Sequence, residues 1–138
     1  MAPSDLIPDG YALQARRSPA TRAWEPIYFR IADGSYQLAI RFGPAHANTR
    51  GGLHGGVIAT LADNAMGLTL ALSGSGEPAG FVTTSLSVDY ISAAKQGQWI
   101  VVAPRLIKRG KTSGVVDALV YADEVLIARA NASFRLSR

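Results

Sequence analysis

Residues 46–72 read HANTRGGLHGGVIATLADNAMGLTLAL, and this stretch decides how the rest of the chain is arranged. It opens polar and rich in glycine. From Val57 to Leu72 its apolar residues then recur every three or four positions, which is the period of a helix. The remaining face is mostly alanine and glycine, and a helix that is apolar almost all round is buried. It is shorter than the roughly 20 residues that cross a bilayer and carries Asp63 at its middle, so we expect a central helix covered by other elements and no membrane span.

Asp63 is the most informative residue of this helix, because a buried carboxylate needs a partner or a function. It is either a structural aspartate held by hydrogen bonds or a general base or nucleophile. Gly55 and Gly56 stand where the helix begins. The amides of a first helical turn lack intrahelical partners and favour negative charge. These two amides can therefore hold a carbonyl oxygen as it becomes an oxyanion.

The composition bounds the class of protein. The chain has 138 residues, 48% of them hydrophobic, which predicts one domain over residues 1–138 with residues 1–23 as a peripheral surface segment. There is no cysteine, which excludes disulfides, thiolate nucleophiles and cysteine-based zinc sites. The first residues contain no apolar run like that of a signal peptide, so we expect a soluble, cytoplasmic protein.

The net charge of +4 comes partly from two basic clusters. One contains Arg16, Arg17 and Arg22, and the other spans residues 105–111. A general nucleic-acid binder usually has a denser basic face with aromatic residues between the charges. The second cluster has no such aromatics, so we expect a small anionic ligand and no nucleic acid.

The pattern around the helix is that of an antiparallel sheet. Residues 27–32 and 35–42 read as a hairpin around Asp33-Gly34, and residues 74–80 end the helix. Four further strands are expected, and Pro104 indicates an edge position or a bulge in the second of them. Residues 11–17 read as a short helix. The four strands are residues 81–90, 99–108, 113–121 and 126–136, the last two joined tightly at Asp123-Glu124.

One long helix needs a strongly curled sheet to cover it, which gives an α+β fold. Within this order, His46-x-Asn48, His54-Gly55-Gly56 and Asp63 resemble the hotdog fold, and more narrowly the PaaI-type acyl-CoA thioesterases of phenylacetic acid degradation. The resemblance covers about residues 27–136 and includes residues 90–95 and 108–112. It implies hydrolysis of an acyl- or aryl-CoA thioester to a free acid and coenzyme A, with no cofactor besides the coenzyme A of the substrate.

The resemblance also implies roles for single residues. Asn48 and Gly55 activate the thioester carbonyl, and Asp63 handles the attacking water. A hydroxyl on the next strand orients that water, which by its position falls on Thr83, with Thr84 and Ser85 as alternatives. Members of this family are often tetramers built from two dimers.

Helix geometry separates two of these residues. Eight residues at about 1.5 Å each place Gly55 and Asp63 about 12 Å apart along one axis, and their directions differ by about 80°. A reacting centre must lie about 3 Å from each group. We therefore expect Gly55 and Asp63 to come from different subunits of an obligate homodimer with two shared sites.

His54 and the turn at residues 108–112 can each be interpreted in two ways. His54 either takes part in catalysis or orients its loop by hydrogen bonds, and His46 and His54 lack an acidic third ligand for zinc. The turn at residues 108–112 is either a solubilising turn or a site for the phosphates of coenzyme A, which the resemblance favours. Its residues are Lys108, Arg109, Gly110, Lys111 and Thr112, and Gly56 is a further candidate for substrate binding.

Two rival functions remain. A protein of the same scaffold can bind acyl-CoA or aromatic ligands without turning them over. A hydratase of this fold usually has an Asp–His pair on the helix, whereas no histidine follows Gly56 here.

Overall fold

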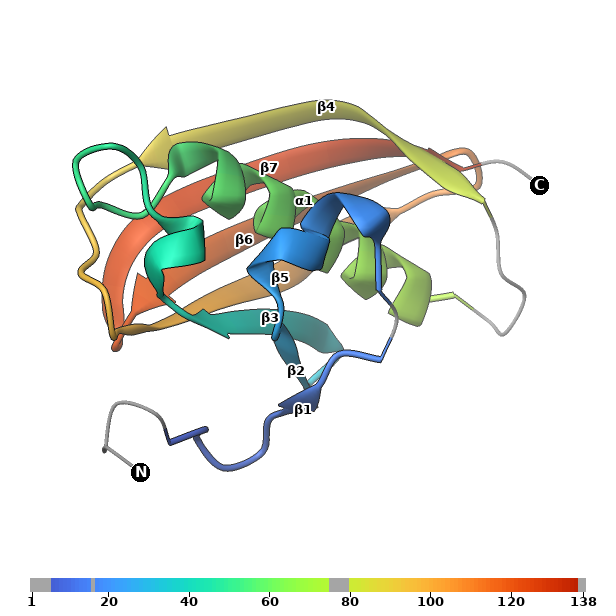
Figure 1. Cartoon of the computed structure of the whole chain (residues 1–138). Coiled ribbons are helices and arrows are strands. Elements are labelled where there is room, and N and C mark those ends of the chain that lie inside the picture. Colours follow the sequence, from blue (N-terminus) through green and yellow to red (C-terminus); the bar gives the residue numbers. More distant parts are fainter. Residues whose placement is uncertain (1–5, 16, 75–79, 137–138) are drawn as a thin grey trace.

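The computed structural model describes residues 6–15, 17–74 and 80–136. In these residues a seven-stranded antiparallel sheet curls around one long helix, α1, which confirms the expected hotdog arrangement (Figure 1). The strand order β1-β2-β3-β5-β6-β7-β4 places β4 at an edge, beside β7. The elements are β1 (Ala12–Leu13), the 3₁₀ helix η2 (Pro19–Trp24), β2 (Tyr28–Ala32), β3 (Ser35–Arg41), the 3₁₀ helix η3 (Pro44–His46), α1 (Gly55–Leu72), β4 (Phe81–Tyr90), β5 (Trp99–Arg109), β6 (Ser113–Ala122) and β7 (Val125–Leu136).

The two tight turns predicted from the sequence form as expected. Asp33 and Gly34 have φ angles of 50° and 77°, the positive values that a two-residue hairpin turn requires. Asp123 and Glu124 do the same between β6 and β7, with φ angles of 44° and 70°. These turns fix the register of the strands that cover α1.

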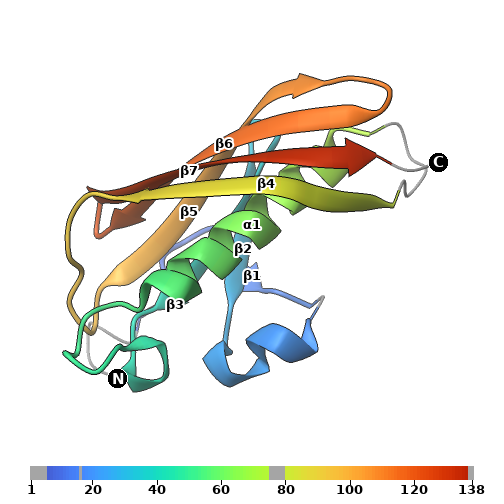
Figure 2. The ribbon, with the colours of Figure 1, turned by 90° about the horizontal axis from the view of Figure 1, so that it is seen from above.

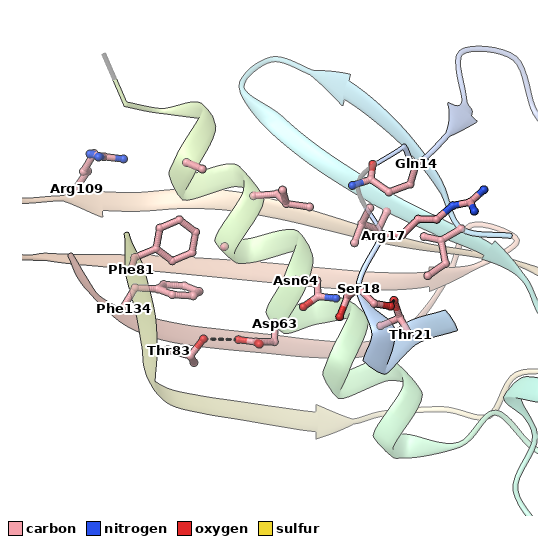
Figure 3. A pocket seen from close by; sticks show the side chains of 15 residues that line it. Gln14, Arg17, Ser18, Thr21, Asp63, Asn64, Phe81, Thr83, Arg109 and Phe134 are labelled. Atoms are coloured by element: carbon pink, nitrogen blue, oxygen red, sulfur yellow. Dashed lines mark hydrogen bonds between the residues drawn. The ribbon is translucent and has the colours of Figure 1, made fainter. Parts of the chain in front are cut away.

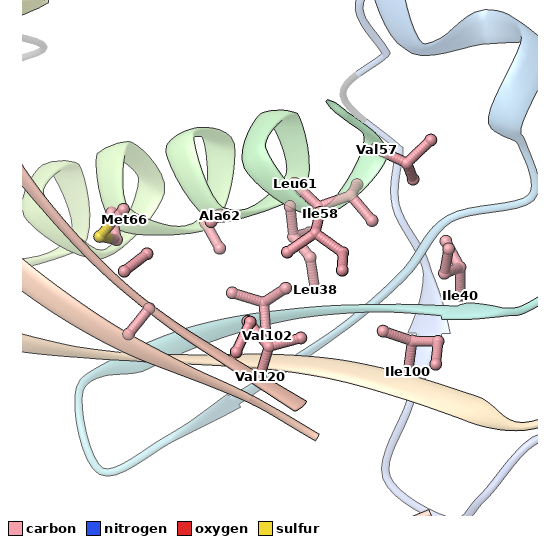
Figure 4. Packing of buried hydrophobic residues seen from close by; sticks show 14 of the residues in the cluster. Leu38, Ile40, Val57, Ile58, Leu61, Ala62, Met66, Ile100, Val102 and Val120 are labelled. Carbon is pink, nitrogen blue, oxygen red and sulfur yellow. The ribbon is translucent and has the colours of Figure 1, made fainter. Parts of the chain in front are cut away.

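One side of α1 packs on the sheet and forms the core (Figures 2 and 4). Ile58, Leu61 and Met66 of the helix are at most 5% exposed and contact residues of β3, β5 and β6, among them Leu38 and Val102. Each large aliphatic side chain buried in this way stabilises the fold by about 1.5–3 kcal/mol. By length and a mean hydropathy of 1.3 this 18-residue helix also meets the criteria for a membrane span, but so do the core helices of soluble proteins.

The other side of α1 is less covered than the sequence suggested. Thr60, Asp63 and Asn64 are only half-buried, and Gly56 is exposed. A single sheet can cover one side of a helix, so the expectation of a helix enclosed on most sides is wrong for the chain alone. β4 is exposed along most of its length as well, and only Phe81 and Val88 are half-buried on it.

The N-terminal segment departs from the prediction. Residues 11–17 were expected to be helical, but Ala12 and Leu13 pair with β2 and form a short strand. Tyr11 packs edge-on against Trp99, with ring centroids 5.2 Å apart, so pairing and aromatic packing override the local helical pattern. A 3₁₀ helix follows instead, with Ser18 as its N-cap and Pro19 at its first position. Arg16 lies outside the described residues.

Pro104 and the end of α1 are the remaining features predicted from the sequence. β5 lies between β3 and β6, so an edge position for its Pro104 is wrong. The proline is tolerated because the β3–β5 ladder ends at Leu38 and Val102, before Pro104 is reached, and the bulge of β5 lies further on, between Leu106 and Lys108. The helix ends at Leu72 as predicted, and residues 75–79 of the expected loop lie outside the described residues.

Candidate active site

Asp63 and Thr83 meet across the gap between α1 and β4. The Thr83 hydroxyl donates a hydrogen bond of 2.7 Å to Asp63 Oδ1 (Figure 3). Of the two alternatives to Thr83, Thr84 donates instead to the Ser133 carbonyl oxygen on β7. The backbone register shifts between Thr83 and Ser85, and this irregularity lies next to the contact. The structure therefore brings Thr83 to the carboxylate, while Asp63 is half-buried and stays open to small molecules.

The Asp63–Thr83 pair lines a cavity of about 370 Å³ (Figure 3). One wall of the cavity is apolar and the other is polar. Phe81 and Phe134 pack edge-to-face with centroids 5.6 Å apart and form an apolar wall together with Gly67. The opposite wall is polar and comes partly from the N-terminal segment. The lining residues are Gln14, Arg17, Ser18, Thr21, Ile27, Leu38, Asp63, Asn64, Gly67, Leu68, Ala71, Phe81, Thr83, Arg109 and Phe134.

The start of α1 leaves one backbone amide available. The Gly56 N–H donates to Nδ1 of the N-cap residue His54 at 2.9 Å, and the Val57 N–H donates to the His54 carbonyl oxygen at 3.0 Å. Among the described residues the Gly55 N–H has no acceptor. Both glycine amides were candidates to hold a carbonyl oxygen, with Gly55 assigned to the carbonyl and Gly56 to substrate binding, but among the described residues only the Gly55 N–H has no acceptor. The Gly56 amide is already engaged by the N-cap.

The two histidines have different structural partners. Because His54 Nδ1 accepts the Gly56 N–H, the neutral ring carries its proton on Nε2. His46 is buried, accepts the Gly43 N–H at Nδ1 and places Nε2 3.0 Å from the Trp24 carbonyl oxygen. Both rings therefore hold backbone in place. Within residues 6–15, 17–74 and 80–136, no group of three His, Cys, Asp or Glu side chains is arranged to hold a metal ion.

Asn48 lies in the loop that leads to the helix. Its side-chain oxygen accepts the Arg50 and Gly52 N–H groups, at 2.9 and 3.1 Å. The His54 N–H also donates to the His46 carbonyl oxygen, which closes the loop into a narrow two-stranded turn. Oδ1 of Asn48 is therefore used by the loop, and its Nδ2 group remains as the donor that the side chain can offer to a ligand.

Gly55 and Asp63 do not come together within the chain. Both belong to α1, eight residues and therefore about 12 Å apart along its axis. The structure thus contains two separate half-sites. The acidic half-site consists of Asp63 and Thr83. The amide half-site is the start of α1, where Gly55 follows the N-cap residue His54, and Asn48 of the preceding loop is a candidate second donor.

The basic turn at residues 108–112 divides into two parts. Arg109 donates from Nη1 to the Leu70 carbonyl oxygen at 2.5 Å and to Ser73 Oγ at 3.1 Å, so its cation lies at the C-terminus of α1, where a positive charge is favourable. It also lines the cavity. The other residues of the turn, Lys108, Gly110, Lys111 and Thr112, are exposed.

Three features of the site could not be predicted from the sequence. The cap by Arg109 joins residues 39 positions apart, and the polar cavity wall comes from the N-terminal segment. Tyr90 donates its hydroxyl to the Gly55 carbonyl oxygen at 2.6 Å. All three are long-range contacts, for which spacing along the chain carries no signal. Tyr90 and Arg109 both belong to stretches that the resemblance had pointed to, residues 90–95 and 108–112, but their partners could not be predicted from it.

Known proteins resemble this chain over most of its length. The family model described as the thioesterase superfamily matches residues 50–128. A Pseudomonas aeruginosa protein named provisionally as the esterase PA0474 is 33% identical over 132 residues, which are 94% of this chain and 97% of that protein. Human acyl-coenzyme A thioesterase 13 is 36% identical over 81 residues, which are 59% of this chain and 56% of that protein.

The fold is shared with solved structures of the same kind. Zebra fish thioesterase superfamily member 2 superposes with a TM-score of 0.78 at 26% sequence identity, covering 87% of this chain and 88% of that one. The family match spans more than half of the sequence and includes α1 and β4, where Asp63 and Thr83 meet. The chain therefore belongs to the thioesterase superfamily and is a thioester hydrolase of the hotdog fold.

Proposed function

We propose that this thioesterase hydrolyses acyl-CoA thioesters to a free acid and coenzyme A, with Asp63 as its general base. The observation that carries the proposal is the 2.7 Å hydrogen bond between Thr83 and Asp63 at the wall of the cavity. Similarity to a human acyl-coenzyme A thioesterase supports the substrate class. The alignment with that relative covers 59% of this chain and 56% of that protein.

The chemistry follows from the two half-sites. A thioester carbonyl is poorly conjugated, and its hydrolysis needs a polarised oxygen and a positioned water. The Gly55 N–H and Asn48 Nδ2 donate to the carbonyl oxygen and stabilise the negative charge of the tetrahedral intermediate. Thr83 holds the water, and Asp63 takes its proton as the oxygen attacks the carbonyl carbon. Collapse of the intermediate breaks the C–S bond, and the thiolate of coenzyme A leaves with the proton that Asp63 took from the water, which restores the carboxylate. Direct attack by Asp63 through a mixed anhydride is the alternative.

The site requires two copies of the chain. Asp63 of one subunit faces Gly55 and Asn48 of the other, because one helix cannot present both groups to one carbonyl. The open edge of the sheet supports this arrangement. β4 has β7 on one side and no strand on the other among the described residues, and Val82 and Leu86 on it are 61% and 39% exposed. Such an edge favours pairing with another chain. We infer a homodimer with two shared sites, assembled further into a dimer of dimers.

The coenzyme A moiety lies over the turn at residues 108–112. Lys108 and Lys111 are exposed and supply the positive charge for its phosphates, with the Thr112 hydroxyl as a further donor. Arg109 is committed mainly to the end of α1. The acyl group enters the cavity beside Phe81 and Phe134. Its volume lies at the lower end of the range of about 300–1,000 Å³ found for ligand pockets, which favours short or aromatic acyl groups. We propose that the enzyme works in the cytoplasm, a reducing compartment that suits a chain without cysteine.

The deciding experiment measures thiol release from short, long and aromatic acyl-CoAs by the wild type and Asp63→Asn. Asparagine keeps the shape of the side chain but cannot accept the proton, so turnover falls at least about a hundredfold. The thermal unfolding midpoint of the variant stays within a few degrees of the wild type. An unfolded variant would instead assign Asp63 a structural role. Binding of acyl-CoA without turnover by the wild type would identify a binding protein.

A further inference from the structure

One peptide group at the start of α1 is held at both ends by side chains. The Gly55 carbonyl oxygen accepts the Tyr90 hydroxyl at 2.6 Å. The N–H of the same peptide group, on Gly56, donates to His54 Nδ1 at 2.9 Å. Two side chains from different parts of the chain therefore fix the orientation of the peptide plane between the two glycines.

The tyrosine lies directly against the glycine. A β-carbon added to Gly55 would be 3.1 Å from the Tyr90 ring carbon Cζ and from its hydroxyl oxygen. Such a distance is tighter than ordinary van der Waals contact, so the ring approaches this closely only because residue 55 is glycine. Glycine is also the residue whose backbone is least restrained by its own side chain. The glycine adds no restraint of its own beyond that of the helix, and Tyr90 and His54 add two contacts from side chains.

The next amide along the backbone is the one that the proposed reaction uses. The Gly55 N–H has no acceptor among the described residues, and it is joined to the clamped peptide through the Gly55 α-carbon. Rotation about that atom redirects the N–H. An oxyanion donor contributes most when it already points at the developing charge and needs no reorganisation.

We propose that Tyr90 is a positioning residue that aims the Gly55 amide at the thioester carbonyl. This inference rests on the proposed function of Gly55. Tyr90 acts through the hydrogen bond to the Gly55 carbonyl and touches neither the water nor the carbonyl of the substrate. It also gives β4 a part in both half-sites, because Thr83 and Tyr90 lie on the same strand.

Because Tyr90 is largely exposed, its positioning role can be tested apart from any role in stabilising the fold. The residue is 55% exposed, so its ring adds little to the hydrophobic core. Removing only the hydroxyl should therefore leave the fold intact. What changes is the freedom of the Gly55–Gly56 peptide.

The test compares Tyr90→Phe with the wild type and with Tyr11→Phe. Tyr11 donates a long hydrogen bond of 3.4 Å to Gln37, packs on Trp99 and lines no part of the Asp63 cavity, so it is a matched control. We expect Tyr90→Phe to lower kcat about threefold to tenfold, the effect of one hydrogen bond, while KM and the unfolding midpoint stay unchanged. Tyr11→Phe leaves kcat unchanged. An unchanged kcat in Tyr90→Phe, or a raised KM with unchanged kcat, overturns the proposal.

A second measurement is independent of turnover. In a ¹⁵N relaxation experiment the Gly55 amide of the wild type and of Tyr11→Phe should be as rigid as the rest of α1, with an order parameter of about 0.85. In Tyr90→Phe the order parameter of Gly55 should fall, while that of residues in the middle of α1 does not. Equal rigidity of Gly55 in all three proteins refutes the positioning role. A wild type that hydrolyses no thioester refutes the proposed function instead, and the relaxation data then still decide whether Tyr90 restrains Gly55.

Discussion

Thr83 on β4 donates its hydroxyl to Asp63 on α1, and this contact joins the edge of the sheet to the central helix at the wall of the cavity. The hydroxyl keeps its lone pairs free while its proton is engaged, so it can accept a hydrogen bond from a water beside the carboxylate. The geometry separates the roles of neighbouring hydroxyl residues that the sequence alone left open.

Thr83→Val should lower kcat about tenfold, because one oriented hydrogen bond to the water is lost while the β-branched shape is kept. Thr83→Ser restores the hydroxyl and should recover most of the activity. Thr84→Val is the matched control, since the Thr84 hydroxyl bonds to the Ser133 carbonyl oxygen. The measurement is kcat of each variant from steady-state kinetics with one acyl-CoA. Equal losses from the two valine variants would show that Thr83 has no special role.

Gly67→Ala should change which acyl groups are accepted. A β-carbon at Gly67 would lie 3.0 Å from Cε2 of Phe81, so the ring must move and the apolar wall of the cavity narrows. We expect kcat/KM for aromatic acyl-CoAs to fall about tenfold or more, as unfavourable packing costs about 1–3 kcal/mol, while acetyl-CoA is affected less.

Gly43→Ala is the control for that change. A β-carbon there meets nothing nearer than the Arg41 carbonyl oxygen at 3.9 Å, and the backbone is extended. It should leave the ratio of aromatic to acetyl activity unchanged. If Gly67→Ala also leaves this ratio unchanged, the acyl group does not occupy this cavity.

The basic turn can be divided by two sets of substitutions. Arg109→Gln removes the cation from the C-terminus of α1 and should reduce the free energy of unfolding by about 1 kcal/mol. Lys108→Gln and Lys111→Gln make no such contact and should leave stability unchanged, but raise KM for acyl-CoAs, more so at low ionic strength. Thermal unfolding and KM measured on the same three variants separate the two effects. An unchanged KM in both lysine variants would mean that the turn only joins two strands and keeps the surface soluble, without binding coenzyme A.

Subunit complementation tests whether the half-sites belong to different chains. Asp63→Asn and Asn48→Ala should each be nearly inactive alone. In a mixed dimer, one site combines the intact Asp63 of one subunit with the intact Asn48 of the other. Random mixing of the two variants after unfolding and refolding should therefore restore about one quarter of the wild-type activity, since half of the dimers are mixed and each has one intact site. No recovery would indicate that Asp63 and Asn48 serve the same site from one chain.

Much of the fold could be predicted because its signals are local. The three- to four-residue period of the apolar residues predicted α1. The sequences Asp33-Gly34 and Asp123-Glu124 predicted tight turns, because few other residues adopt the backbone angles of such turns. The alternation of apolar and polar residues predicted the later strands to within a residue or two. The errors have a common cause. Residues 11–17 and Pro104 were interpreted from local preference, whereas pairing with β2 and the end of the β3–β5 ladder decided their structures.

In the candidate site too, some features could be predicted from the sequence and others could not. Thr83 could be placed from a resemblance, because its strand follows α1 directly and contacts it. The engagement of the Gly56 amide by His54, the commitment of Arg109 to α1 and the bond from Tyr90 to Gly55 could not be foreseen. Each of these hydrogen bonds depends on how donor and acceptor are oriented in the folded chain, and the spacing of residues along the sequence does not show that orientation.

The position of β4 has a consequence for how the enzyme responds to its own concentration. Among the described residues, the strand that carries Thr83 and Tyr90 pairs with one strand only, β7, and its contacts with α1 are made by side chains. In the proposed dimer its other edge is held by the second copy, so association and ordering of both half-sites are one equilibrium. By mass action, specific activity should then decline on dilution below the dissociation constant and recover on concentration, with the subunit remaining folded throughout. Abundance in the cell would set not only the number of active sites but also the fraction of them that works.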